Sequence, residues 1–68
     1  MFIIVKYALD HWPTGKAPIE ASVYGSYSAR ELGIKSTSYP SKEAAEPDLE
    51  KLMEFNPTVH YGIVEVER

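Results

Sequence analysis

Residues 41–55 have the pattern of an amphipathic helix, and this segment constrains the fold more than any other part of the chain. At about 100° of rotation per residue, four apolar side chains fall on one side of such a helix: Ala45, Leu49, Leu52 and Met53. Four glutamates fall together on the opposite side: Glu43, Glu46, Glu50 and Glu54. The pattern therefore predicts a helix that packs its apolar side on the rest of the protein and turns its acidic side to water.

The ends of this helix are also visible in the sequence. The Ser41 hydroxyl is suited to cap the first turn, because it accepts a hydrogen bond from a free backbone N–H, and Pro57 follows the last turn. Pro47 cannot donate to the Glu43 carbonyl, so either Pro47 begins the main helix or one helix bends there. The apolar stripe continues on both sides of the proline, which favours one bent helix.

Three other segments have the composition of β-strands: residues 2–9, 19–27 and 58–68. The first is apolar on nearly both faces, which is typical of a central strand. The second alternates apolar and polar residues, as a half-exposed neighbouring strand does. Residues 10–18 contain two prolines and a glycine and are predicted to form a long hairpin loop.

These segments predict a small two-layer ββαβ domain of the α+β class. We expect a three-stranded, mainly antiparallel sheet of order 2-1-3 with one helix packed on one face. Side chains on the other face, such as Phe2, Ile4, Val64 and Val66, then need cover from the Trp12 loop, from residues 28–40 or from a partner. Residues 28–40 give mixed signals: Ala29 to Leu32 fit one helical turn closed by Gly33, and the rest is extended or irregular.

The chain has 68 residues and no cysteine, so we expect one domain, residues 1–68, without a disulfide or a thiolate metal site. A core of this size is small, and a second copy of the chain would add buried surface. No apolar run approaches the ~20 residues of a membrane span. The start of the chain also lacks the pattern of a secretory signal, and we expect a cytoplasmic protein.

The formal net charge of −3 arises within the predicted helix, which has five acidic residues and two lysines. The acidic and basic residues of the remaining chain cancel. An acidic surface repels phosphate backbones and anionic lipids, so nucleic-acid and membrane partners are disfavoured. A basic protein surface is attracted instead.

The sequence contains no pattern typical of an enzyme or of a metal or cofactor site. His11 and His60 are far apart and lack the spacing of paired metal ligands. Without a cysteine or a G-x-S-x-G motif, no nucleophile or general acid is indicated. We therefore expect a non-enzymatic protein that uses no cofactor.

The predicted function is protein–protein interaction, through the acidic helix face or through an uncovered face of the sheet. The partner is then a protein with a basic surface or a second copy of the chain, and Trp12 is a candidate aromatic contact. The plainer interpretation is a solvated helix face and a tryptophan that folds over the open side of the sheet. The alternative function is binding of single-stranded nucleic acid through tyrosines expected on strands: Tyr7, Tyr24, Tyr27 and Tyr61.

Overall fold

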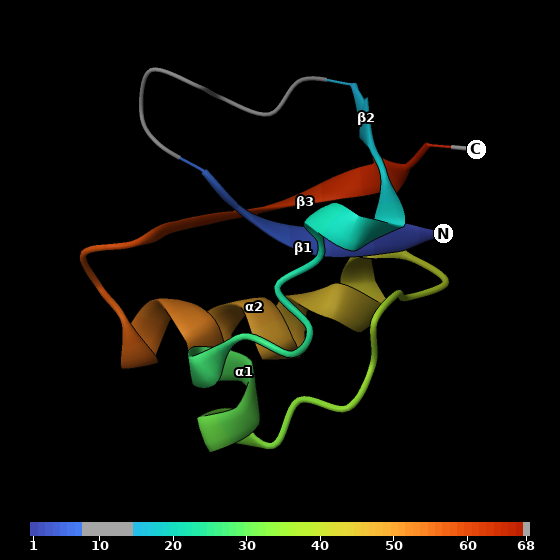
Figure 1. The fold of residues 1–68 in the computed structure, drawn as a ribbon. Helices are drawn as coiled ribbons and strands as arrows, with labels where there is room; N and C mark the ends of the chain where they lie inside the picture. The colour runs from blue at the N-terminus through green and yellow to red at the C-terminus, as the bar shows by residue number, and fades with distance from the viewer. Residues whose placement is uncertain (8–14, 68) are drawn as a thin grey trace.

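The computed structural model describes residues 1–7 and 15–67, which form a small α+β domain with a three-stranded mixed sheet. Its elements follow the chain in this order: β1 (Phe2–Tyr7), β2 (Lys16–Ala17), the 3₁₀ helix η1 (Ile19–Ala21), α1 (Tyr27–Leu32), α2 (Lys42–Phe55) and β3 (His60–Val66). Both α-helices lie on the same side of the sheet, with α2 below β1 and β3 in the view of Figure 1. The predicted fold class is confirmed.

The first and last strands form the main part of the sheet. β1 and β3 pair antiparallel, from Phe2 opposite Glu65 to Tyr7 opposite His60. The β-branched residues of both strands fit this half-buried, pleated arrangement. The expectation that the first and last strands are antiparallel neighbours is therefore confirmed.

The predicted strand order 2-1-3 is wrong, because β3 lies in the middle and the order is β1-β3-β2. The second strand is only Lys16–Ala17, within the expected hairpin loop, and it runs parallel to β3. Pro18 follows directly and has no backbone N–H with which to continue the ladder. The sheet is therefore mixed, and its antiparallel part is the β1–β3 pair.

Residues 19–27 are not the strand that their alternation predicts. They begin with η1 and touch the free edge of β1 at one point, where Ser22 pairs with Val5 and the Val23 N–H donates to the Ile4 carbonyl at 2.9 Å. Gly25 then takes a positive φ of 88°, which turns the chain into α1. The segment flanks β1 as expected, but the turn limits it to a single bridge.

The helical turn expected before Gly33 is present and belongs to α1. The Ser26 hydroxyl accepts a hydrogen bond from the Ala29 N–H and caps the start of this helix. Gly33 ends it with a φ of 71°, in the left-handed region that favours glycine. The expectation for residues 29–33 is confirmed, and the helix begins two residues earlier, at Tyr27.

The helix predicted for residues 41–55 is confirmed as α2. The Ser41 hydroxyl accepts from the Ala44 N–H, and Pro47 lies inside one continuous helix rather than at the start of a second one. The Asn56 N–H closes the last turn on the Leu52 carbonyl at 2.9 Å. Within residues 1–7 and 15–67, no helix has the length and apolar content needed to span a membrane.

The main hydrophobic core lies between the sheet and the helices. Ile4 and Tyr61 contribute from the sheet and Leu52 from α2, and the full buried set is Ile4, Val23, Ala29, Ile34, Tyr39, Ala45, Leu52 and Tyr61. Leu52 and Ala45 have no exposed surface, and Leu49 packs against the same cluster as predicted. The apolar side of α2 therefore holds the helix on the sheet.

Met53 is the exception to the predicted apolar stripe, because half of its surface (50%) is exposed. It follows Leu52 directly, and one residue rotates the helix by about 100°. With the buried side centred on Ala45 and Leu52, this rotation carries Met53 away from the core and toward solvent.

A second, smaller hydrophobic cluster lies on the other face of the sheet. Ile3, Val5 and Val64 are buried there, with Ala17 and Val66 packed against them. Val64 and Val66 lie on this face as expected, whereas Ile4 belongs to the core on the helix side. Ile3, Val5 and Val64 are only 0–7% exposed, so these side chains have the cover that the sequence predicts they need, whereas Ala17 and Val66 are partly buried.

Tyr39 ties the connection between the helices to both the sheet and α2. Its backbone exchanges two hydrogen bonds of 2.8 Å with Phe2 at the edge of β1, and its hydroxyl donates to Asp48 Oδ2 at 2.5 Å. Burial raises the pKa of the Tyr39 hydroxyl above its usual range, and the hydrogen bond and negative charge of Asp48 raise it further. Tyr39 is therefore a neutral donor at neutral pH.

Candidate functional site

The acidic face of α2 consists of four exposed glutamates: Glu43, Glu46, Glu50 and Glu54. They point away from Ala45 and Leu52, which anchor the opposite side of the helix in the core. Within residues 1–7 and 15–67, none of the four forms an ion pair or a side-chain hydrogen bond. The structure therefore leaves their carboxylates free toward solvent, as the sequence predicts.

The lysines of α2 do not neutralise this acidic face. Lys51 Nζ lies 3.7 Å from Asp48 Oδ1, so it pairs with the one acidic residue of the helix that faces the core side. Glu46, Glu50 and Glu54 are spaced four residues apart, and each such pair of like charges costs about 0.2–0.5 kcal/mol in a helix. The face is anionic at a small cost to the stability of α2.

An exposed apolar side chain borders the acidic face. Met53, which is 50% exposed, lies three residues after Glu50 and seven after Glu46, on the same side of the helix. A thioether adapts its shape to different apolar surfaces. A partner that binds this face thus meets carboxylates and one flexible apolar group.

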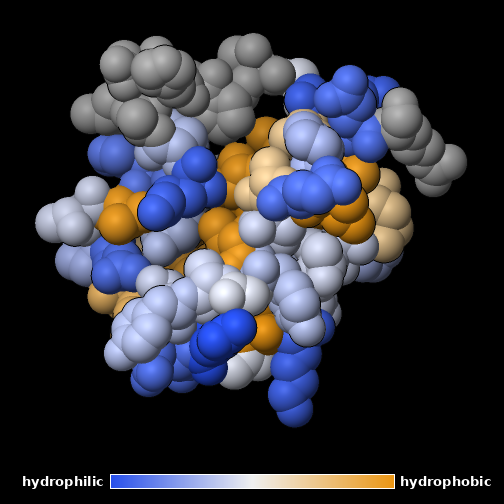
Figure 2. Space-filling model, viewed as in Figure 1, coloured by the Kyte–Doolittle hydropathy of each residue, from blue (hydrophilic) through white to orange (hydrophobic). Residues whose placement is uncertain are grey.

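Two other features from the sequence do not add to this site. Trp12 lies outside the described residues, as does His11. On the face of the sheet opposite α2, Ile3, Val5 and Val64 are buried and Ala17 and Val66 are partly buried, so little apolar surface is exposed there. On the side shown in Figure 2, apolar side chains reach the surface in small separate areas between hydrophilic ones.

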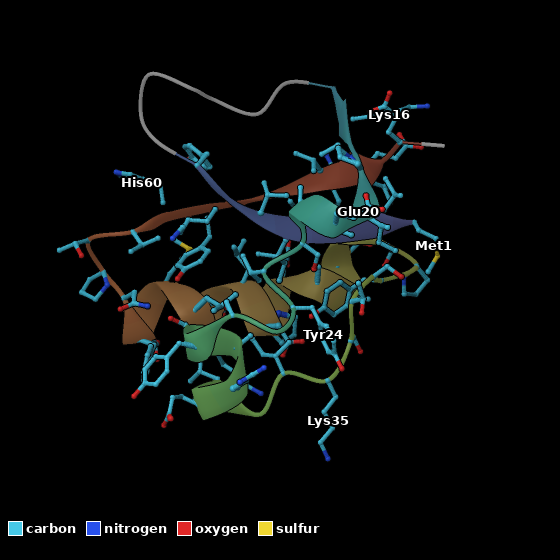
Figure 3. The ribbon with its side chains drawn as sticks, viewed as in Figure 1. Met1, Lys16, Glu20, Tyr24, Lys35 and His60 are labelled. Atoms are coloured by element: carbon cyan, nitrogen blue, oxygen red, sulfur yellow. The ribbon has the colours of Figure 1, made fainter. Side chains whose placement is uncertain are left out.

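The tyrosines expected to bind nucleic acid do not share one face of the sheet. Tyr61 is buried in the core on the helix side, whereas Tyr7 stacks on His60, with ring centroids 5.8 Å apart, on the opposite face. Tyr24 lies outside the strands, on the connection to α1 (Figure 3), and Tyr27 is the first residue of α1. The expectation that all four lie on strands is wrong, because residues 24–27 form a turn and a helix start.

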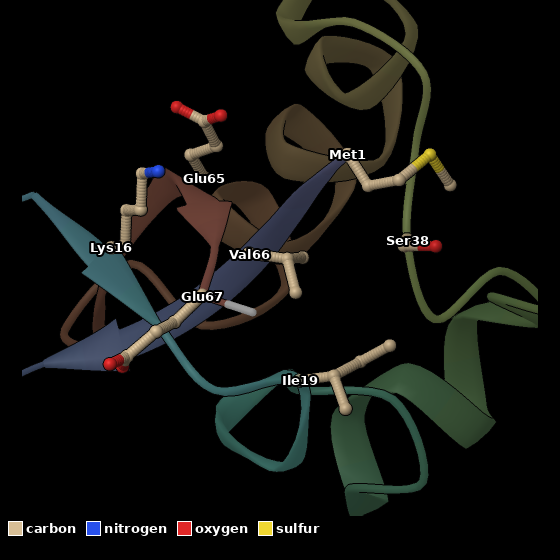
Figure 4. A pocket seen from close by; sticks show the side chains of 7 residues that line it. All are labelled: Met1, Lys16, Ile19, Ser38, Glu65, Val66 and Glu67. Atoms are coloured by element: carbon tan, nitrogen blue, oxygen red, sulfur yellow. The ribbon is translucent and has the colours of Figure 1, made fainter.

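Hollows in the surface were not predicted from the sequence, and two of them join several segments of the described chain. One, of about 330 Å³, lies at the end of β3, where Met1, Val66 and Ile19 extend toward the side of Ser38 (Figure 4), and Lys16, Glu65 and Glu67 also line it. The other, of about 390 Å³, lies where the end of β1 meets the start of α1. Each joins residues from at least three segments, so no local sequence pattern reveals it.

The chain matches no family model, no curated protein and no solved structure in the comparisons that we made. Among the described residues no three His, Asp or Glu side chains gather as a metal site would require. Of the residues predicted to bind a protein partner, the four glutamates lie together on the exposed side of α2.

Proposed function

We propose that the chain is a non-enzymatic protein-binding module that docks through the acidic face of α2. The observation that supports this proposal is that four exposed glutamates of one helix lack counter-charges within residues 1–7 and 15–67, while Lys51 of the same helix pairs with Asp48. A partner with a basic surface would supply those counter-charges on binding. Such complementarity accelerates association and selects against partners of the same sign.

The proposed partner is a different protein rather than a second copy of the chain. Two copies of the acidic face repel each other, and the apolar residues on the opposite side of the sheet are already buried. Met53, at the border of the acidic face, would add one apolar contact to the ionic ones. A cytoplasmic location belongs to the same proposal, and fractionation of cells that express the tagged chain tests it.

A charge-reversal experiment tests the acidic face. The tagged chain is used to capture partners from a native lysate, and mass spectrometry identifies the proteins retained. The test variant is Glu46→Lys with Glu50→Lys, and the control is Glu20→Lys with Glu67→Lys, two exposed acids outside α2. Both variants change the net charge equally, so a difference between them reports the position of the charges.

We expect the wild type and the control to retain the same basic partner, and the α2 variant to lose it. Urea unfolding of all three proteins verifies that each is folded, since exposed charges have small effects on stability. Equal capture of the partner by the wild type and the α2 variant would exclude the acidic face as the docking surface.

A further inference from the structure

The hollow of about 390 Å³ lies between the end of β1, residues 21–23, the start of α1 and the core side of β3. The described residues that line it include Lys6, Ser22, Val23, Tyr27, Ser28 and Tyr61. Lys6 and Tyr61 come from directly opposite positions of β1 and β3, so both point toward the side of the sheet that carries the helices. The hollow is thus built by the sheet and by α1 together.

The charge at this hollow differs in sign from that of α2. Lys6 is the one charged side chain among the described lining residues, and no carboxylate accompanies it there. Its side chain is exposed and forms no ion pair within residues 1–7 and 15–67. Lys6 lines both this hollow and a neighbouring one that contains Val59 and His60, and its ammonium group has no ion-pair partner among the described residues.

Two hydroxyl groups at the hollow are positioned by Asn56. Its side-chain Nδ2 donates to Ser28 Oγ at 2.5 Å and to Tyr61 Oη at 3.3 Å. Each hydroxyl oxygen acts as an acceptor in these bonds and retains its own proton for donation. Ser22 differs, because its hydroxyl already donates to the Thr37 carbonyl at 3.1 Å.

Aromatic and apolar surface completes the lining. The side chain of Tyr27 is 74% exposed, so one face of its ring is open to a ligand, and the Tyr61 ring is nearly buried. Val23 adds aliphatic surface from the neighbouring segment. A ligand ring would gain contact area here without any rearrangement of the core.

We propose that this hollow binds a small organic phosphate that carries an aromatic ring. Lys6 pairs with the phosphate, the Ser28 and Tyr61 hydroxyls donate to its oxygens, and Tyr27 packs on the ring. This site is separate from the acidic face of α2 and does not depend on the proposed protein partner. One cation and two neutral donors correspond to a weak, reversible site rather than a tightly held cofactor.

Titration of the ¹⁵N-labelled chain followed by NMR tests this site with three probes: phenyl phosphate, inorganic phosphate and phenol. We expect saturable shifts of the backbone amides that line the hollow, with affinity highest for phenyl phosphate and lower for each of the other probes. Lys6→Gln should weaken phenyl phosphate binding roughly tenfold, the effect of losing one charge-assisted hydrogen bond. Tyr27→Ala should reduce the affinity for phenyl phosphate to that for inorganic phosphate.

The matched control is Lys35→Gln, which removes an exposed lysine outside the hollow and far from the sheet (Figure 3). It should leave the affinity for phenyl phosphate unchanged. Absence of saturable shifts at the hollow with phenyl phosphate, or equal affinities of the wild type and Lys6→Gln, would overturn the proposal. Binding of phenol as tight as that of phenyl phosphate would overturn it too, because the phosphate would then contribute nothing.

Discussion

The Tyr39 side chain connects the segment before α2 to the main core through its ring and to α2 through its hydroxyl. The ring is buried in the main core, and the hydroxyl donates to Asp48 Oδ2 at 2.5 Å. A hydrogen bond to a charged group contributes about 1.5–3 kcal/mol. Because Asp48 is partly exposed and also pairs with Lys51, we expect Tyr39→Phe to lower the free energy of unfolding by about 1–2 kcal/mol.

Urea unfolding measures this loss, and Tyr24→Phe is the matched control. Tyr24 is 49% exposed, and its hydroxyl forms no side-chain hydrogen bond within residues 1–7 and 15–67. Its removal should change the free energy of unfolding by less than about 0.5 kcal/mol. Equal effects of the two substitutions would show that the Tyr39–Asp48 bond does not stabilise the fold.

The raised pKa of Tyr39 predicts a loss of stability in alkali. Burial and Asp48 keep the folded hydroxyl protonated above the usual tyrosine pKa of 10.0, so the unfolded chain loses this proton first as the pH rises. The stabilising contribution is complete below pH 10.0 and decreases above it. The free energy of unfolding should therefore fall more steeply above pH 10.0 for the wild type than for Tyr39→Phe, and parallel curves would contradict this.

The sequence could not predict the Tyr39–Asp48 bond. The two residues lie nine positions apart, with Tyr39 in a segment of mixed signals and Asp48 among the acids of a helix. Only the return of the chain along the edge of β1, where Tyr39 pairs with Phe2, places the hydroxyl over α2. Burial of a tyrosine with a paired carboxylate is a tertiary effect that no local pattern encodes.

Pro47 lies inside α2, and its replacement tests how much this proline costs the helix in stability. Proline removes the backbone hydrogen bond to the Glu43 carbonyl and is about 3 kcal/mol less favourable than alanine in a helix interior. Its rigidity in the unfolded chain offsets roughly 0.4–1 kcal/mol of that loss. We expect Pro47→Ala to raise the free energy of unfolding by about 2–2.6 kcal/mol in thermal or urea unfolding. A decrease in stability would mean that the helix requires the proline.

The two sides of α2 should respond very differently to truncation at neighbouring positions. Leu52 has no exposed surface, so Leu52→Ala should lower the free energy of unfolding by about 2–5 kcal/mol. Met53→Ala removes a half-exposed side chain and should lower it by less than about 1 kcal/mol. Urea unfolding of both variants measures the contrast, and similar losses would contradict the orientation of the helix.

The sequence predicts α2 well because its capping residue, apolar spacing and acidic spacing all indicate the same helix. The start of α1 was missed, since alternation through residues 19–27 favoured a strand. There the Ser26 cap and the positive φ of Gly25 override the pattern. The two-residue β2 is too short to show a periodicity, and it pairs with the edge of β3 that β1 leaves free.

For the whole molecule, the predicted α+β fold class is right, but the predicted strand order 2-1-3 is wrong, since the observed order is β1-β3-β2. Hydrophobic periodicity identifies strands and helices, but it does not determine which strand lies in the middle of a sheet. Here the chain passes from β2, on one edge, through η1 to the bridge between Ser22 and Val5 on the other edge. β3 therefore lies in the centre of the sheet, and α2 lies against one face of β1 and β3 (Figure 1).

The surface features also differ in whether the sequence alone predicts them. The exposure of the four glutamates was predicted, because it depends only on the helical period and on which side of α2 is buried. The hollow beside Lys6 was not, because it is assembled from β1, the 21–23 segment, α1 and β3. The molecule thus has an acidic helix face that the sequence predicts. It also has a hollow, with Lys6 as the charged residue among its described lining residues, that is recognised only in the folded structure.

The most direct test of the acidic face is the affinity of the captured basic partner, measured by calorimetry at two salt concentrations. For the wild type, we expect tight binding that weakens as salt screens the glutamates. For Glu46→Lys with Glu50→Lys, we expect weaker binding and a smaller dependence on salt. An affinity and a salt dependence equal to those of the wild type would contradict the account.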